Sequence, residues 1–367
     1  MTQVQNLPSQ SYSGGVNPLV QLLDHPLAID SLGHWKSKNI NMTVFEHLNQ
    51  THPHQVMVKV PATTANLGPG FDCIGAALNL YNCFHFSLPT SRSTPTLTII
   101  ANGVGAERVA IDTSNLVYRS FASFFQQLGK TPPPVVITIH MSIPLARGLG
   151  SSATAIVGGI MAANHLMHSP FSQADVMQLA IALEGHPDNV VPALVGGCQL
   201  ATTINPTSNP SHLITPISWH PSLTPIIAIP DFELSTQAAR QVLPLQYPRE
   251  DVIFNTSHLG LLIRALETKN PEWLRIALAD RIHQPYRQAL IPGYEQVHGA
   301  AIAAGAYGVV ISGAGPSLLA LVDQSQAAGV ILAMEQAWLE VGLTSTVQAM
   351  TLDQGGATLI EPVHPMA

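Results

Sequence analysis

A glycine-rich stretch followed by adjacent serines is the part of this sequence with the clearest chemical meaning. It reads PLARGLGSSATA over residues 144–155, between a predicted strand and a predicted helix. Gly148 and Gly150 allow positive φ and let the backbone approach a ligand closely. The first N–H groups of a helix have no internal partner, and the helix dipole favours an anion beside them. The stretch therefore predicts a phosphate-binding loop, in which Ser151 and Ser152 reach phosphate oxygens or Mg²⁺.

Two other interpretations of this loop stay open at the level of the sequence. It is not a Walker A loop, because no Lys precedes its serines, but Gly148, Gly150 and Ala153 match the GxGxxA form of the dinucleotide fingerprint. That fingerprint expects an acid about 20 residues on, at the end of a second strand. Here the following segment is predicted as a helix, and Asp175 as part of its cap. The other alternative is a tight turn whose glycines serve packing alone.

Three motifs in order along the chain resemble those of the GHMP kinases, a family of small-molecule kinases. They are KVPATTANLGPGFDCIGAAL at residues 59–78, the glycine-rich stretch, and ISGAGPSLLALV at residues 311–322. The resemblance covers about residues 56–350. One departure is Thr154, where the family often has Ala, although a small residue still fits a packed helix. The resemblance implies an α+β fold of two domains, an N-terminal α/β domain like domain 2 of ribosomal protein S5 and a C-terminal ferredoxin-like α+β domain.

The resemblance implies that the loop binds ATP together with Mg²⁺. The implied ATP-binding residues are Asn115, Pro144, Leu145, Ala146, Arg147, Gly148, Leu149, Gly150, Ser151, Ser152, Ala153 and Thr154. Ser152 and Glu184 would hold Mg²⁺, which prefers hard oxygen ligands. The implied catalytic residues are Ser152, Glu184 and Asp188. Two simpler roles stay open: Asn115 also suits a helix N-cap, and Glu184 could be an ordinary exposed carboxylate at a helix end.

Further stretches resemble the branch of the family that phosphorylates L-homoserine for threonine biosynthesis. They are EGHPDNVVPALVGG at 184–197, IPDFELSTQAARQVLP at 229–244 and HQPYRQALIPG at 283–293. The implied substrate-binding residues are Asn66, Asp72, His186, Asp188, Arg240, Arg287 and Gly313. Guanidinium groups can bind a carboxylate with two hydrogen bonds, and Asp72 could bind the ammonium. Two surface arginines are the alternative.

Asp188 is the nearest candidate for a general base, and that role is a hypothesis. The loose transition state of phosphoryl transfer asks little of a base, because the attacking oxygen gains little bonding early. Competing functions are a sister kinase, such as a mevalonate or diphosphocytidyl-erythritol kinase, and a non-catalytic ligand sensor. The sister kinases act on substrates without an α-amino acid head group, so Asp72, Arg240 and Arg287 discriminate against them. A sensor would be expected to lose its Mg²⁺ ligands, so the presence of Ser152, Glu184 and the loop glycines argues against it.

The elements that position these residues follow from hydrophobic periodicity and from capping signals. The predicted strands are 56–60, 78–88, 97–101, 135–139, 224–230, 307–311 and 318–322. The predicted helices are 116–128, 152–167, one that starts at a Ser172–Asp175 capping box and ends near 184, then 252–267, 295–304 and 327–341. Strands mixed with helices without strict alternation indicate an α+β fold. The Pro-, Asn- and Ser-rich residues 202–213 suggest a domain boundary.

The bulk composition narrows the remaining possibilities. Of the 367 residues, 46% are apolar and 10% charged, and the net charge of -7 comes without a basic block, which argues against nucleic acid as a partner. Three cysteines without a CxxC pair favour a reducing compartment. The first basic residue is Lys36, which argues against a secretory signal, and no apolar run is long enough to span a bilayer. We expect a soluble cytoplasmic protein with no membrane partner and leave a homodimer open.

The predicted domain division has three parts. Residues 1–54 are polar and turn-rich with weak periodicity, and are expected to form a flexible N-terminal extension. Residues 55–205 would form the domain with the phosphate loop, and residues 213–360 the second domain.

Overall fold

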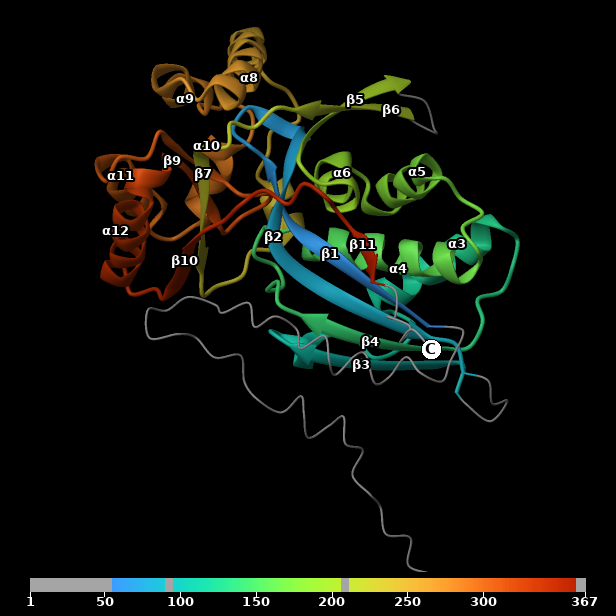
Figure 1. Ribbon diagram of the computed structural model, residues 1–367. Coiled ribbons are helices and arrows are strands. Elements are labelled where there is room, and N and C mark those ends of the chain that lie inside the picture. The colour runs from blue at the N-terminus through green and yellow to red at the C-terminus, as the bar shows by residue number, and fades with distance from the viewer. Residues whose placement is uncertain (1–54, 90–94, 206–210, 361–367) are drawn as a thin grey trace, which may run out of the picture. The chain divides into compact units, whose positions relative to one another are not determined.

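The computed structural model describes residues 55–89, 95–205 and 211–360 of the chain (Figure 1). Two long antiparallel strands, β1 (Gln55–Asn66) and β2 (Gly70–Ser87), form the centre of the first sheet. The other strands of this sheet are β3 (Leu97–Gly103), β4 (Val135–Met141), β5 (Cys198–Asn205), β6 (Ser211–Ile217) and β11 (Thr358–Ile360). Its order is β11–β1–β2–β4–β3, while β5 pairs with β2 and β6 with β5.

The β1–β2 hairpin extends further than the alternating apolar residues predict. The predicted strand 56–60 lies inside β1, and the predicted strand 78–88 lies inside β2 except for Leu88, but pairing continues through the first motif to Asn66 opposite Gly70. Register irregularities fall between Pro61 and Ala62 and again beside Asn66. Small residues in this stretch give no clear period of two, which is why periodicity missed the extension. The first motif is therefore the closed end of a hairpin, where Asn66 and Asp72 both adopt positive φ, at 74° and 54°.

Four helices pack against one face of the first sheet (Figure 1). They are α3 (Leu116–Gln127), α4 (Ser151–Leu166), α5 (Gln173–Glu184) and α6 (Pro187–Val195). Asn115 caps α3 by accepting hydrogen bonds from two backbone N–H groups, and Ser172 forms a capping box with Asp175, so both predicted caps are confirmed. Sequence reasoning missed α6, which contains the Asp188–Asn189 pair.

Helix α4 lies at the centre of this helical layer because its own glycines let it approach its neighbours. A Cβ on Gly158 would lie 2.4 Å from the ring of Phe84, and one on Gly159 would lie 2.5 Å from the carbonyl oxygen of Val117. Contacts shorter than about 3 Å are not tolerated, so both positions require glycine in this packing. Close packing against β2 and α3 fixes the position of the first turn of α4, where the glycine-rich loop ends.

The second sheet is antiparallel and has the order β10–β7–β9–β8. Its strands are β7 (Leu223–Pro230), β8 (Gly308–Ile311), β9 (Leu318–Asp323) and β10 (Ser345–Ala349). In chain order this is fourth, first, third, second, which is the order of a ferredoxin-like β-α-β-β-α-β unit. The other α-helices are α7 (Thr236–Gln241), α8 (Arg249–Thr268), α9 (Pro271–Ala277), α10 (Gln284–Arg287), α11 (Tyr294–Ala303) and α12 (Ala327–Glu340). Short 3-10 turns lie at Ala106–Arg108, Gln288–Leu290 and Gln324–Gln326.

Alternation along the strands of the second sheet divides their side chains between two apolar cores. Val309 and Leu318 pack with α11 and α12, whereas their chain neighbours Val310 and Leu319 pack with α8, α9 and the end of the β1–β2 hairpin. Successive residues of a strand point to opposite faces, so this short sheet is covered on both sides. The second of these cores also contains Leu149 of the glycine-rich loop and thereby anchors that loop.

The structure bears on some of the expectations from the sequence and leaves others as predictions. Residues 198–205 and 211–217 form the paired antiparallel strands β5 and β6 of the first sheet, and β11 pairs with β1. The domain division at residues 205 and 213 stays a prediction. The expected flexible extension, residues 1–54, lies outside the described residues. No helix among the described residues is long and apolar enough to cross a membrane. The cysteines Cys73, Cys83 and Cys198 are free thiols.

Candidate functional site

The glycine-rich loop connects β4 to α4 as predicted, and its glycines are required for two reasons. Gly148 and Gly150 have φ of 72° and 65°, where other residues are strained. A Cβ on Gly148 would lie 2.2 Å from the carbonyl oxygen of Ser312, and one on Gly150 would lie 1.9 Å from Thr63 Oγ1. Helix α4 starts at Ser151 directly after Gly150, so its first N–H groups lie at the loop.

The three motifs come together around this loop although they are far apart in the sequence. The N–H of Thr63 donates to the carbonyl of Leu149 at 3.1 Å, and the N–H of Gly313 donates to the carbonyl of Ala65 at 3.0 Å. The hydroxyl of Ser312 lies 2.8 Å from the carbonyl oxygen of Gly148. Thr63 and Ser312 lie within the first and third motifs but were not predicted as site residues, because spacing alone does not show which motifs touch.

A cavity of about 380 Å³ opens beside the loop, and most of the predicted site residues line it. Those that do are Asn66, Asp72, Asn115, residues 144–152, Glu184, His186, Asp188, Arg240, Arg287 and Gly313. Ala153 and Thr154 are fully buried behind the loop, where the Thr154 hydroxyl accepts a hydrogen bond from Asn82 and donates to the carbonyl of Ser151. Their predicted contact with ATP stays a prediction.

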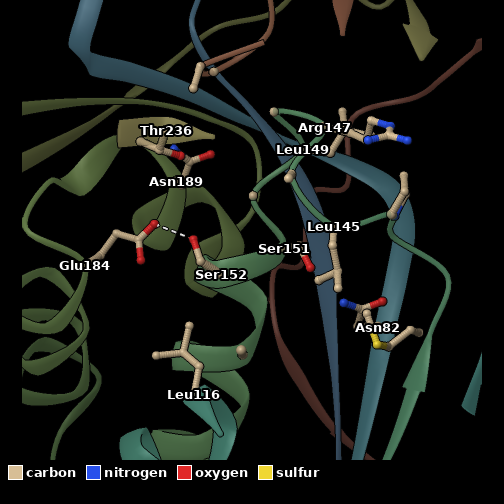
Figure 2. Close-up of a pocket in the computed structure, with 18 of the residues that line it drawn as sticks. Asn82, Leu116, Leu145, Arg147, Leu149, Ser151, Ser152, Glu184, Asn189 and Thr236 are labelled. Carbon is tan, nitrogen blue, oxygen red and sulfur yellow. Dashed lines mark hydrogen bonds between the residues drawn. The ribbon is translucent and has the colours of Figure 1, made fainter. Parts of the chain in front are cut away.

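The two predicted metal ligands lie next to each other at the start of α4. Ser152 Oγ donates to Glu184 Oε1 at 2.7 Å, with Glu184 at the last residue of α5 (Figure 2). Burial raises the pKa of the Glu184 carboxyl above its ordinary value of 4.5, although the hydrogen bond from Ser152 opposes this. Glu184 is partly buried and accepts a hydrogen bond, which distinguishes it from an ordinary exposed carboxylate at a helix end. A hydroxyl and a carboxylate are hard oxygen donors of the kind that Mg²⁺ accepts, so this pair fits the implied ion.

The first turn of α6 presents a second polar group to the cavity. His186 Nδ1 lies 2.5 Å from Asp188 Oδ1, and Asn189 accepts a hydrogen bond from Thr63 Oγ1 at 2.7 Å. Burial acts to lower the pKa of His186, but the hydrogen bond and the charge of Asp188 outweigh it and raise the pKa overall. Asp188 itself is only 2% exposed. A buried carboxylate held by an imidazole is positioned to accept a hydrogen bond from a ligand in the cavity.

A bidentate ion pair between Asp72 and Arg240 joins the first motif to α7. Arg240 donates from both terminal nitrogens to the two oxygens of Asp72, at 3.0 and 2.8 Å, with the side chains 39% and 31% exposed. Asn66 fixes the Asp72 backbone by accepting from its N–H at 2.9 Å, and it donates to the carbonyl of Gly313 at 2.7 Å. The structure therefore brings these four predicted residues into contact.

Arg287 is buried, so the alternative of two surface arginines is wrong for it. It is 1% exposed and donates to the carbonyls of Ala239 and Gly313, at 3.0 and 3.1 Å. Burial lowers the pKa of its guanidinium, although Asp72 acts in the opposite direction. Because Ala239 precedes Arg240, this contact also fixes the short helix from which Arg240 reaches the cavity.

Two predicted ATP-binding side chains have structural partners. The carboxamide oxygen of Asn115 accepts from the N–H groups of Val117 and Tyr118, and its nitrogen donates to the carbonyl of Ala110, which confirms the capping role. Arg147 points away from Ser152 and Glu184 (Figure 2). Its guanidinium lies 3.3 Å from Asp231 and 3.5 Å from Glu233, just before α7. Their predicted contacts with ATP stay predictions.

Comparisons with known proteins identify the family and the fold of the chain. The sequence models of the GHMP kinases N-terminal and C-terminal domains match residues 115–197 and 262–340. The chain is 61% identical over 303 residues to a homoserine kinase of Trichormus variabilis, covering 83% of this chain and 98% of the relative, and 60% identical to one of Nostoc sp. with the same coverage. A crystal structure of homoserine kinase from Cytophaga hutchinsonii superimposes with a TM-score of 0.75 at 30% identity, over 85% of this chain and 99% of that one. Mevalonate kinase of L. major, at 15% identity, shares the fold with a TM-score of 0.61, over 81% of this chain and 95% of that one.

Proposed function

The chain belongs to the GHMP kinase family, and we infer that it transfers the γ-phosphoryl group of ATP to the side-chain hydroxyl of L-homoserine. The product is O-phospho-L-homoserine, an intermediate of threonine biosynthesis. The observation that carries this inference is one cavity that joins the Ser152–Glu184 pair at a helix N-terminus to the Asp72–Arg240 pair. The first pair suits a nucleotide phosphate chain, and the second suits an α-amino acid.

The phosphate chain would lie against the loop and the first turn of α4. Backbone N–H groups from Ser151 onward provide donors, and the helix dipole adds attraction for an anion. We propose that Ser152 and Glu184 hold Mg²⁺, which when bound would neutralise charge on the phosphates. The chain's own contribution is to fix these oxygen donors, because α4 is locked by its glycines and Glu184 ends the neighbouring helix.

The amino-acid head group would meet two charges of opposite sign. The ammonium of homoserine suits Asp72, and its carboxylate suits the planar guanidinium of Arg240. In this proposal, binding of homoserine breaks the Asp72–Arg240 ion pair. Two ion pairs replace it, one between Asp72 and the ammonium and one between Arg240 and the carboxylate. The buried Arg287 and the Asn66–Gly313 contact hold the backbone around the two charges. A substrate without an ammonium, such as mevalonate, would leave Asp72 without a matching charge.

The acceptor hydroxyl would then point toward the first turn of α6. His186 and Asn189 both lie within hydrogen-bond reach of Asp188 Oδ1, at 2.5 and 3.4 Å. Because these two side chains hold the Asp188 carboxylate in place, Asp188 is suited to orient a substrate hydroxyl. Positioning and electrostatic stabilisation contribute most of the catalysis in phosphoryl transfer. Proton transfer to Asp188 stays a hypothesis.

A coupled assay of ADP release with L-homoserine, mevalonate and galactose as acceptors tests the proposal directly. We expect turnover with homoserine and a kcat/KM for mevalonate and galactose lower by at least a factor of a hundred, since these acceptors would leave the carboxylate of Asp72 without its ammonium partner. Absence of turnover with homoserine would refute the assignment. A cytoplasmic location and a homodimeric assembly stay predictions.

A further inference from the structure

Phe71, next to Asp72 in the first motif, contacts three cationic or polar side chains. They are Arg240 of α7, Arg287 of α10 and His283, the N-cap residue of α10. The guanidinium carbon of Arg240 lies 5.8 Å from the centre of its ring, and that of Arg287 lies 5.0 Å away. The ring of His283 stacks on it with a centroid distance of 5.1 Å and an interplanar angle of 24°. A cation within about 6 Å of an aromatic ring centre is attracted by the ring quadrupole.

The surroundings of Phe71 differ from those of a core phenylalanine. None of the three apolar clusters in the described part of the chain contains Phe71. Its ring is partly exposed and lies among two guanidinium groups and an imidazole. Simple filling of a hydrophobic core therefore does not explain this residue.

His283 connects this ring to Arg287 and to the hairpin turn. Its Nε2 lies 2.8 Å from the carbonyl oxygen of Gly68, and because a carbonyl only accepts, Nε2 carries the hydrogen. Nδ1 is then an acceptor, and it faces Arg287 Nη1 at 3.5 Å. Burial lowers the pKa of His283, which is consistent with a neutral ring. The imidazole is thus held at both nitrogens with its face on Phe71.

We propose that Phe71 is a positioning residue that aligns the guanidinium groups of Arg240 and Arg287 for the substrate carboxylate. The ring restricts the long, partly exposed side chain of Arg240 to one side of the cavity, while the adjacent Asp72 provides the charge for the ammonium. Phe71 and Asp72 are neighbours on β2, so a single short segment would set the spacing between the two sites for the zwitterion. This inference rests on the proposed function.

The test compares Phe71→Leu and Phe71→Tyr with the wild-type protein, using L-homoserine and 3-amino-1-propanol, which is homoserine without its carboxylate. For Phe71→Leu we expect the homoserine KM to rise about tenfold, or ~1.4 kcal/mol, with the ATP KM within about twofold of wild type. The kcat/KM or inhibition constant of the amino alcohol should change less than about threefold. Phe71→Tyr keeps the ring and should stay near wild type.

Phe254 provides a matched control, because it forms a similar cluster outside the cavity. His258 stacks on its ring at 3.7 Å, and the guanidinium carbon of Arg281 lies 4.1 Å from its centre. Phe254→Leu should leave the homoserine KM unchanged. Equal losses for homoserine and the amino alcohol in Phe71→Leu, or no loss for either, would overturn the positioning role.

The test of Phe71 also distinguishes two failures, a variant that does not fold and a wild-type protein that does not phosphorylate homoserine. If Phe71→Leu does not fold, 3,4,5-trifluorophenylalanine at this position keeps the ring but weakens its attraction for cations, and it should raise the homoserine KM selectively. A homoserine KM unchanged by fluorination would overturn the inference. If the wild-type protein does not phosphorylate homoserine, the proposed function fails and this inference with it, whereas an active wild type with insensitive variants refutes only the role of Phe71.

Discussion

Gly148→Ala should disrupt the phosphate loop through one close contact with the C-terminal glycine motif. The φ of Gly148 is 72°, and a Cβ there would lie 2.2 Å from the carbonyl oxygen of Ser312 and 2.9 Å from that of Gly315. Relief to an ordinary contact requires the two loops to separate by roughly 1 Å. Left-handed backbone costs an alanine ~1–2 kcal/mol, and overpacking adds ~1–3 kcal/mol. We expect the free energy of unfolding to fall by ~2–5 kcal/mol.

Gly129→Ala separates the backbone cost from the contact. Gly129 follows α3 with φ of 63°, and a Cβ there would meet nothing within 4 Å, so only the ~1–2 kcal/mol of left-handed strain applies. Urea unfolding of both variants gives the difference. Because a displacement near 1 Å can cost about a hundredfold in rate, kcat/KM for ATP should fall at least tenfold in Gly148→Ala and stay near wild type in Gly129→Ala. Equal destabilisation with unchanged kinetics would refute the contact argument.

The other predictions concern the proposed metal ligand Ser152, the buried carboxylate of Asp188 and the three cysteine thiols. Ser152→Ala should lower kcat by one to several powers of ten through lost metal placement, and unchanged turnover would remove Ser152 from the mechanism. Asp188→Asn separates orientation from proton transfer: a kcat near wild type with a raised homoserine KM rejects a base role. Burial, reinforced for Cys73 by nearby carboxylates, raises the pKa of Cys73 and Cys198 to about 12 and that of Cys83 to about 11. Less than about one thiol in 10³ is then ionised at pH 8, so disulfide reagents should label the folded protein slowly, with a rate that rises tenfold per pH unit, and rapid labelling at pH 7.5 would contradict this.

Local chemistry explains which features the sequence could predict. Asn115 and Ser172 were found as caps because a cap depends on residues within one turn. The start of α4 followed from two glycines and the serines after them. Strands β5 and β6 were missed because the sequence of residues 202–213 has the composition of a linker, and tertiary pairing of the two strands overrode that local signal.

Within the site, the sequence predicted residue types better than it predicted contacts. Asp72 and Arg240 were both assigned to the substrate, but their pairing joins residues 168 positions apart, and no pattern in the sequence encodes it. Arg287 could not be distinguished from a surface arginine, since burial of a charged side chain depends on the carbonyls that surround it. Thr63 and Ser312 escaped notice for the same reason, because their roles come from long-range packing.

Contacts between segments that lie far apart in the chain connect the proposed nucleotide part of the site to the proposed amino-acid part. The N–H of Leu234 donates to the carbonyl of Ala146 in the phosphate loop at 3.3 Å, two residues before α7 begins. Glu233 forms ion pairs with both Arg108 and Arg147, so the segment that leads to Arg240 is attached to the loop. We therefore expect movement of the glycine-rich loop to displace Arg240, and alignment of the proposed ATP and homoserine sites to depend on these contacts between segments rather than on either motif alone.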